Sequence, residues 1–373
     1  MRLLLALCCS VFSLLGISQP HEYYMMVGSY TNHIEVYKFN TNTGSANLVS
    51  TFTGTSNPSY LTVSDNGKFV YAVNENHKEI PGAVSAFSFN KKNGTLQLLN
   101  TTPSGGDDPC YIDVDATHTW AAVANYSSGS LSMLKINADG SLQPLAQNIE
   151  HHGYSVNVTR QEQAHVHCTI FSPGNKYLFV DDLGTDKVYQ YHFNPTNETA
   201  PLSETDTALF DVPDGYGPRH LTFSPNKKFA YLITELAGKV ICFNYDSNTG
   251  RLQAIQTIAS CTVGDPNERG SADIHITPDG KYLYTSNRGK ANDITIYRIA
   301  ANGTLTELGH QSTLGVHPRN FVIDPTGKFL LVANRDTNNI VVFTIYKSTG
   351  MLVPTGVQIK SEKPVCLKMF PVQ

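Results

Sequence analysis

The chain has 373 residues, of which 40% are hydrophobic and only 16% are charged, so it is long enough to bury a large core. Its formal net charge is −4 and it contains no basic run, which argues against a nucleic-acid partner. Tyrosine (19 residues) and phenylalanine (17 residues) are common, and Asn-Gly, Asp-Gly and Thr-Gly pairs recur. This composition favours β-strands joined by hairpins, and β folds often form one long domain.

The first 18 residues differ from the rest of the chain. Arg2 is followed by an apolar run that reaches Ile17, and the sequence turns polar from Ser18 onward. This pattern is typical of a secretory signal peptide over residues 1–18, cleaved near Gln19. The alternative is a membrane anchor, but the run is short for a span, which needs roughly 20 residues. We therefore expect a secreted, extracellular protein without a membrane-spanning segment in its mature part.

Two further features bear on secretion. Sequons for N-glycosylation occur at Asn93, Asn100, Asn125, Asn157, Asn197 and Asn302. Beyond the signal segment five cysteines remain, at Cys110, Cys168, Cys242, Cys261 and Cys366. Their odd number and wide spacing do not fit a disulfide framework, and no Cys-X-X-Cys pair suggests a metal. We expect buried free thiols, with one disulfide between neighbouring strands as the alternative.

One unit recurs about every 50 residues: an alternating apolar strand, a turn rich in Pro, Asp, Gly and Asn, and a second apolar strand. The copies occupy residues 57–75, 108–126, 165–183, 216–235, 271–288 and 317–335. Their turn residues are Asp65, Ala116, Pro173, Pro225, Pro278 and Pro325, which lie 47 to 57 residues apart. Such a period, with strand signals alone, predicts the blades of a β-propeller.

Two more strands follow each copy, as in residues 240–258, so six complete four-stranded repeats are visible. Residues 22–52 resemble the second to fourth strands of a seventh repeat, and residues 364–371 resemble its missing first strand. Joining the two ends in one blade would close the ring. We therefore predict an all-β fold, a seven-bladed β-propeller of four antiparallel strands per blade, as a single domain over residues 20–373.

The first strand of a propeller blade lines the central channel, and antiparallel pairing puts its start beside the end of the second strand. Arg219 and Glu235 are equally far from the turn between them, so we expect them side by side at the channel mouth. Equivalent residues of the other blades, here called the mouth positions, are expected on the same face. At the starts of the first strands they are Ser59, Cys110, His167, Arg219, Ala272 and Arg319. At the ends of the second strands they are Glu75, Tyr126, Leu183, Glu235, Arg288 and Arg335, with Tyr30 from the N-terminal blade.

The mouth positions differ in residue type from blade to blade, whereas the turn prolines and glycines recur. Since structural positions of a repeat keep their residue type, charges that converge on one funnel predict a small polar site. The alternative is a solvated rim of charges that only keeps the disc soluble.

Three features of the sequence point to a known family. They are GPRHLTFSP followed by ITEL, the segment ADIHITPDGKYLYTSNR, and a histidine six residues before Pro173. The chain resembles the lactonase-type seven-bladed propellers, which include bacterial propeller 6-phosphogluconolactonases and fungal carboxymuconate-lactonising enzymes. The resemblance covers nearly the whole mature chain and implies catalytic roles for His167, Arg219, Glu235 and Arg288. The phosphogluconolactonases of that family act in the cytoplasm. A signal peptide would therefore remove this chain from the compartment that holds sugar phosphates.

Opening a lactone needs a base for water and stabilisation of the carbonyl oxygen as charge builds. We expect Arg219 and Arg288 to clamp the anion, because guanidinium groups bind carboxylate or phosphate in two-pronged fashion. Either His167, titrating near neutral pH, or Glu235 is expected to be the acid or base. A structural cross-strand ion pair is the alternative role for Arg219 and Glu235. Further candidates for substrate contact are Arg319, Arg335, Glu75 and Asp273.

His165 and His167 fall on one side of a strand, and such a pair can bind zinc. No third ligand follows at metal spacing, so we expect no metal and no cofactor. We expect a monomer that takes a small anionic lactone or sugar acid and binds neither nucleic acid nor membrane. The alternatives are a secreted propeller that binds an anion or a partner protein without catalysis, a lactonising cycloisomerase, and a structural extracellular propeller.

Overall fold

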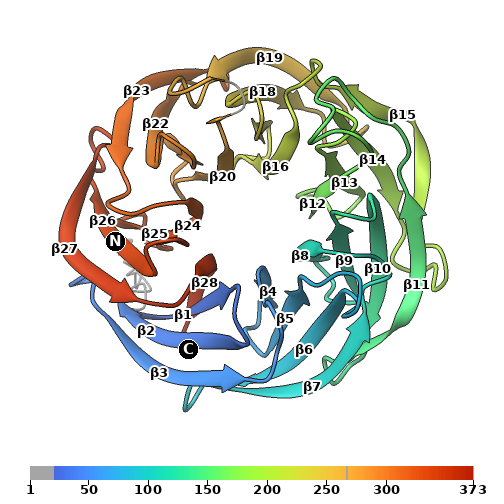
Figure 1. The fold of residues 1–373 in the computed structure, drawn as a ribbon, viewed down its shortest axis with the longest axis horizontal. Coiled ribbons are helices and arrows are strands. Elements are labelled where there is room, and N and C mark those ends of the chain that lie inside the picture. Colours follow the sequence, from blue (N-terminus) through green and yellow to red (C-terminus); the bar gives the residue numbers. More distant parts are fainter. Residues whose placement is uncertain (1–20, 266–267, 373) are drawn as a thin grey trace, which may run out of the picture.

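A computed structural model describes residues 21–265 and 268–372, apart from the side chains of residues 206–209. The described residues form 28 strands in seven four-stranded antiparallel sheets, which surround a central axis as the blades of a propeller (Figure 1). The predicted fold class and blade number are therefore confirmed. No described residue belongs to a helix long and apolar enough to cross a bilayer.

Six blades run outward from the axis in chain order. The first three are β4 (Leu61–Val63), β5 (Phe69–Asn74), β6 (Ala83–Asn90) and β7 (Thr95–Pro103); β8 (Pro109–Val114), β9 (Trp120–Asn125), β10 (Ser130–Ile136) and β11 (Leu142–Glu150); and β12 (Val166–Phe171), β13 (Tyr177–Asp182), β14 (Lys187–Phe193) and β15 (Leu202–Asp211). The next three are β16 (Pro218–Phe223), β17 (Phe229–Thr234), β18 (Lys239–Tyr245) and β19 (Leu252–Ala259); β20 (Ser271–Ile276), β21 (Tyr282–Asn287), β22 (Asp293–Ile299) and β23 (Leu305–Ser312); and β24 (Pro318–Ile323), β25 (Phe329–Asn334), β26 (Asn339–Ile345) and β27 (Leu352–Lys360).

The seventh blade joins the two ends of the chain, as the sequence predicts. Its strands are, from the axis outward, β28 (Pro364–Pro371), β1 (Glu22–Ser29), β2 (His33–Asn40) and β3 (Ala46–Thr53). The C-terminal β28 pairs antiparallel with β1, from Tyr23 opposite Pro371 to Ser29 opposite Pro364. In Figure 1 this blade is where the red end of the chain meets the blue end.

The core lies between neighbouring blades, because each sheet buries both of its faces. The second strands are buried almost throughout, and β9 (WAAVAN) has no exposed residue. Between the last two chain-ordered blades, Tyr284 packs with Leu330 and Phe343 in one buried cluster. The outermost strands consist mostly of half-buried and exposed residues, as β19 does. Packing of this kind requires the long alternating apolar strands that the sequence repeats.

The turn between the first two strands is fixed by a side chain just before the recurring proline position. Ser224 Oγ accepts the N–H of Phe229 (3.0 Å), and Asp324 Oδ1 accepts that of Phe329 (2.5 Å). Side chains that bond the backbone of their own turn are common for Ser and Asp. The repeated turn therefore sets the register of each hairpin and explains why the turn residues mark the blades.

All five cysteines of the described residues are buried free thiols, so the alternative of an inter-strand disulfide is not realised. The sequons differ in access. Asn93, Asn197 and Asn302 are exposed. Asn125 is fully buried, and its Nδ2 donates to Ser130 and Ser132. Folding therefore closes the Asn125 sequon to modification.

Candidate active site at the channel mouth

β-Bulges at the axial ends of the inner strands direct the mouth side chains. The register between first and second strands shifts at Cys110, His167, Arg219 and Arg319, and also between Ser271 and Ile274 of β20. Cys110, Arg219 and Arg319 each follow a proline. The residue before that proline has a positive φ in each case: Asp108 (50°), Gly217 (65°) and His317 (63°). A bulge re-aims the side chain of the extra residue, and bulges are common beside active sites.

Backbone hydrogen bonds tie the end of each second strand to the start of the first. The N–H of Glu235 donates to Gly217 O (2.7 Å), and that of Arg288 donates to Gly270 O (3.0 Å). The predicted side-by-side placement of Arg219 and Glu235 is confirmed, since Arg219 Nε donates to Glu235 Oε2 at 2.9 Å. Such bonds bring the two mouth positions of each of the six chain-ordered blades to the same end of its inner hairpin.

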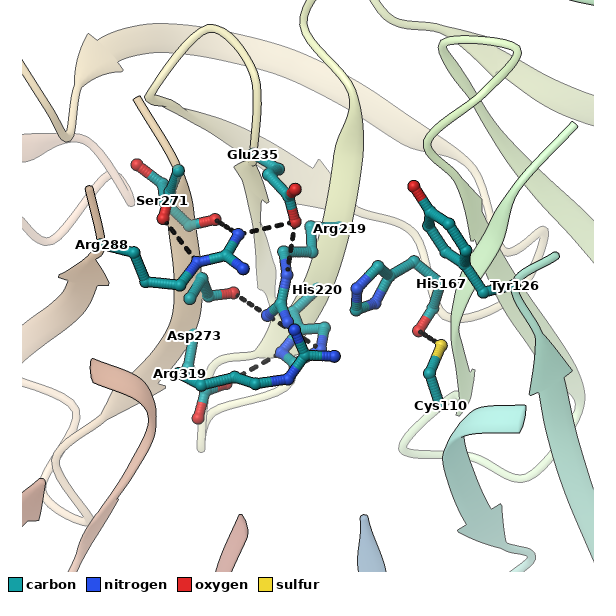
Figure 2. Close-up of polar contacts among 12 residues, drawn as sticks. Cys110, Tyr126, His167, Arg219, His220, Glu235, Ser271, Asp273, Arg288 and Arg319 are labelled. Atoms are coloured by element: carbon teal, nitrogen blue, oxygen red, sulfur yellow. Dashed lines mark hydrogen bonds and ion pairs between the residues drawn. The ribbon is translucent and has the colours of Figure 1, made fainter. Parts of the chain in front are cut away.

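Glu235 is held by three arginines, Arg160, Arg219 and Arg288, which we call the arginine cluster. Glu235 Oε2 accepts from Arg219 Nε (2.9 Å) and contacts Arg288 Nη2 (2.8 Å), and Oε1 accepts from Arg160 Nη2 (2.6 Å). Figure 2 shows Arg219 and Arg288 converging on this carboxylate. One carboxylate facing three guanidinium groups leaves two positive charges uncompensated, so the cluster attracts anions.

The cluster is buried on its axial side and open on one edge. The side chains of Arg219 and Glu235 are 2% and 6% exposed, whereas that of Arg160 is 42% exposed. Burial alone raises the pKa of Glu235, but Arg288, Arg160 and Arg219 outweigh it and hold this pKa well below its usual range. Burial lowers the pKa of Arg288 to about 10, which still leaves its guanidinium charged at neutral pH.

His167 lies across the mouth from the cluster, with its ring edge toward Tyr126 and His220 (centroids 5.7 and 5.3 Å away). No described residue hydrogen-bonds to its buried Nδ1. Burial, and then the charge of Arg219, hold the pKa of His167 well below its usual value. The expectation that His167 titrates near neutral pH is therefore wrong, because this imidazole is neutral.

The other predicted contacts occupy different places. Arg319 Nη2 lies 3.8 Å from Glu75 Oε1, and Tyr30 OH donates to the same oxygen at 2.8 Å. Arg319 and Arg219 line one small axial cavity of about 10 Å³. Arg335 instead pairs with its neighbour Asp336 (Nε to Oδ1, 2.6 Å). Thus Arg319 shares a cavity with Arg219 and has Glu75 beside it, while Arg335 lines a different cavity together with Tyr30.

Asp273 is engaged by two neighbouring histidines. Its carboxylate is buried and accepts from His220 Nδ1 and His275 Nε2, each at 2.9 Å. The structure therefore places Asp273 behind the mouth, where it bonds to other side chains rather than facing a substrate.

A cavity of about 370 Å³ opens beside the cluster. Its lining residues are Arg160, Glu235, Glu268, Arg269, Gly270, Arg288, Gly289, Lys290 and His317. The volume lies in the range of small-molecule sites. A larger cavity of about 570 Å³, lined by Phe179, Phe210 and Leu252 among others, includes the charge of Arg251 but none of the mouth residues. The charged side chains that line the smaller cavity therefore make it the better candidate for the active site.

Sequence reasoning missed Arg160 and His220. Arg160 comes from the segment between β11 and β12, which has no counterpart in the other repeats. His220 follows Arg219 directly, so strict alternation would have turned it to the other face. Within residues 21–265 and 268–372, no three His, Cys, Asp or Glu side chains are placed to hold a metal ion.

Comparisons with known proteins agree with this architecture. The family model for the lactonase seven-bladed β-propeller matches residues 24–369. A relative from Formosa agariphila named 6-phosphogluconolactonase is 38% identical over 354 residues, which cover 93% of this chain and 99% of the relative.

Two solved structures are also similar. A Bacteroides fragilis protein designated a 6-phosphogluconolactonase has a TM-score of 0.90 and 46% identity, covering 95% of this chain and 99% of its own. The periplasmic gluconolactonase of Pseudomonas aeruginosa has a TM-score of 0.89 and 34% identity, covering 94% of this chain and all of its own. The chain therefore belongs to the lactonase family of seven-bladed β-propellers.

Proposed function

We propose that the chain is a lactone hydrolase that opens a small anionic sugar lactone at the arginine cluster. The observation that carries the proposal is the net positive cluster around Glu235, with a neutral histidine across the mouth. A lactone hydrolase needs both features, because its oxyanion must be stabilised and its water must lose a proton.

His167 is the group we assign as general base. Its imidazole is unprotonated, whereas both oxygens of Glu235 are occupied by guanidinium groups. An anionic substrate would offset the charge of Arg219, which is one cause of the lowered pKa of His167. Offsetting that charge would remove one cause, while burial, the larger cause, keeps the imidazole unprotonated and able to accept a proton from water.

The reaction then runs in two steps. Water adds to the lactone carbonyl carbon while His167 takes its proton, and Arg219 and Arg288 stabilise the oxyanion that forms. The bond between that carbon and the ring oxygen then breaks, and His167 returns the proton to the ring oxygen. Glu235 orients the two arginines and does not itself carry the proton. A lactonising addition would begin with a protonated donor, which a neutral His167 does not supply.

We also propose that the chain is exported and acts on a lactone outside the cytoplasm. The proposal is supported by the signal-like residues 1–18 and by the likeness to a periplasmic gluconolactonase. An exported enzyme would meet unphosphorylated sugar lactones. Gluconolactone, which is uncharged, is therefore tested beside 6-phosphogluconolactone, which carries the anionic group that the arginine cluster would bind. Residues 1–18 lie outside the described part of the chain.

The test is base uptake in a pH-stat with the purified mature chain, on gluconolactone and on 6-phosphogluconolactone. We expect turnover above the spontaneous rate, reduced by about 10²- to 10⁴-fold in His167→Gln. The matched control is His192→Gln, since His192 is exposed on β14. The proposal would be rejected if neither lactone is turned over, or if His167→Gln turns them over as fast as the wild type. Either result would favour an anion-binding propeller.

A further inference from the structure

Behind the mouth, one buried carboxylate fixes the protonation of a histidine. Asp273 Oδ1 accepts from His220 Nδ1 (2.9 Å) and from the N–H of Ile274 (3.0 Å). Its Oδ2 accepts from His275 Nε2 (2.9 Å) and from Asn320 Nδ2. Burial raises the pKa of Asp273, but His275 and the hydrogen bond from His220 outweigh it and hold this pKa well below its usual range. An ionised carboxylate can only accept, so His220 must carry its proton on Nδ1.

The second ring nitrogen of His220 then has a defined role. Burial, and then Arg219, lower the pKa of His220 to about 3, so the imidazole is neutral and Nε2 carries a lone pair. Arg219 Nη1 lies 3.3 Å from this Nε2, and a guanidinium group can only donate. Only the tautomer with its proton on Nδ1 satisfies both neighbours of the ring.

Arg219 is consequently held from three directions. Its Nε donates to Glu235 Oε2 (2.9 Å), and its Nη1 donates to the carbonyl oxygen of Ala272 as well as to His220 Nε2. His220 itself makes edge contacts with the rings of Tyr111 (centroids 5.1 Å apart) and His167 (5.3 Å). Figure 2 shows Asp273, His220 and Arg219 in this order, from behind the mouth toward Glu235.

We propose that Asp273 and His220 form a positioning pair that orients the guanidinium group of Arg219 for the reaction, through the Nδ1-protonated tautomer of His220. The role of the pair in the reaction rests on the proposed lactone hydrolysis, whereas the tautomer assigned to His220 does not. We assign neither residue a contact with the reacting atoms, and the pair acts by holding Arg219 in place. A misplacement of about 1 Å at a reacting group can cost about 10²-fold in rate.

The first test reads the tautomer directly and needs no substrate. Nitrogen-15 NMR of the histidine-labelled mature chain at pH 7 distinguishes Nδ1-protonated, Nε2-protonated and doubly protonated rings. The His220 signals are assigned as those that disappear in His220→Asn. We expect a proton on Nδ1 and a bare Nε2. A proton on Nε2, or an imidazolium, would overturn the proposal even if the chain hydrolyses lactones.

The second test separates the two contacts of His220. The amide of asparagine overlies Nδ1 and keeps the bond to Asp273, whereas that of glutamine overlies Nε2 and keeps the contact with Arg219. We expect kcat to fall by about 10²-fold in His220→Asn, with little change in KM, and to fall much less in His220→Gln. Equal activity of the two variants would overturn the positioning role.

A matched control is available on the outside of a blade. His310 Nδ1 makes the same kind of contact with Asp293 Oδ2, at 2.9 Å, on the outer strand β23. His310→Asn is expected to leave kcat and KM unchanged. A loss of kcat in this control equal to that in His220→Asn would mean that the effect is general and would also count against the pair.

Discussion

Replacing Glu235 with glutamine removes the one carboxylate that the described structure pairs with each of Arg160, Arg219 and Arg288. The side chain keeps its size and one acceptor oxygen but loses its charge. Arg219 and Arg288 then remain buried, with 2% and 10% of their side chains exposed, and no carboxylate within ion-pair distance among the described residues. The result is an uncompensated buried positive charge.

The free-energy cost of Glu235→Gln follows from how deeply the arginines are buried. Breaking a buried ion pair from one side costs about 3–5 kcal/mol, because the remaining charge stays desolvated. Arg160 adds little, since its side chain is 42% exposed and water can solvate it. We therefore expect Glu235→Gln to lose about 3–5 kcal/mol of the free energy of unfolding.

Urea unfolding at pH 7, with and without phosphate, measures this loss. Phosphate should stabilise Glu235→Gln more than the wild type, because an anion that binds only the folded state takes the place of the missing carboxylate. The control Glu198→Gln breaks an exposed pair with Lys135 and should leave the urea midpoint unchanged. A wild-type midpoint for Glu235→Gln, without a phosphate effect, would refute the charge balance deduced for the cluster.

Three other predictions concern pH, specificity and the core. The pKa of Glu235 is lower in the folded than in the unfolded protein. Its ionised carboxylate therefore stabilises the fold fully above the unfolded pKa of about 4.5, and this stabilisation is lost as the pH falls. In urea titrations below pH 4.5, the difference in stability between wild type and Glu235→Gln should shrink. Arg160→Gln should fold normally but raise KM for an anionic lactone by about 10-fold, because a charge-assisted hydrogen bond is lost; an unchanged KM in pH-stat assays would contradict this. Asp181 is buried without a described hydrogen-bond partner, and burial raises its pKa to about 8. Its folded state therefore retains a proton that the unfolded chain releases, so Asp181→Asn should stabilise the protein at pH 7 but not at pH 4; a gain independent of pH would argue against it.

The propeller and its closing blade could be predicted from the sequence, because blade packing demands an apolar alternation that repeats. The pairing of Arg219 with Glu235 followed from hairpin geometry alone. Antiparallel strands fix which residues face each other once the turn is known. The same reasoning placed Arg288 near Glu235, since both end a second strand at the same face.

The remainder of the site depends on departures from the repeat. The bulge at Arg219 breaks the alternation, so that both Arg219 and His220 reach the axis. Its sequence signal was present as a proline before Cys110, Arg219 and Arg319. Arg160 gave no such signal, because it lies in a segment that occurs once. The neutral state of His167 follows from its burial, which no local pattern reports.

A crystal structure of residues 20–373 with gluconate, the product expected from gluconolactone, tests the central claim most directly. We predict that the gluconate carboxylate lies within hydrogen-bond distance of Arg219 or Arg288, with the ring of His167 beside it. Gluconate bound in the cavity between Phe179 and Leu252, with the arginine cluster unliganded, would contradict the claim that this mouth is the active site.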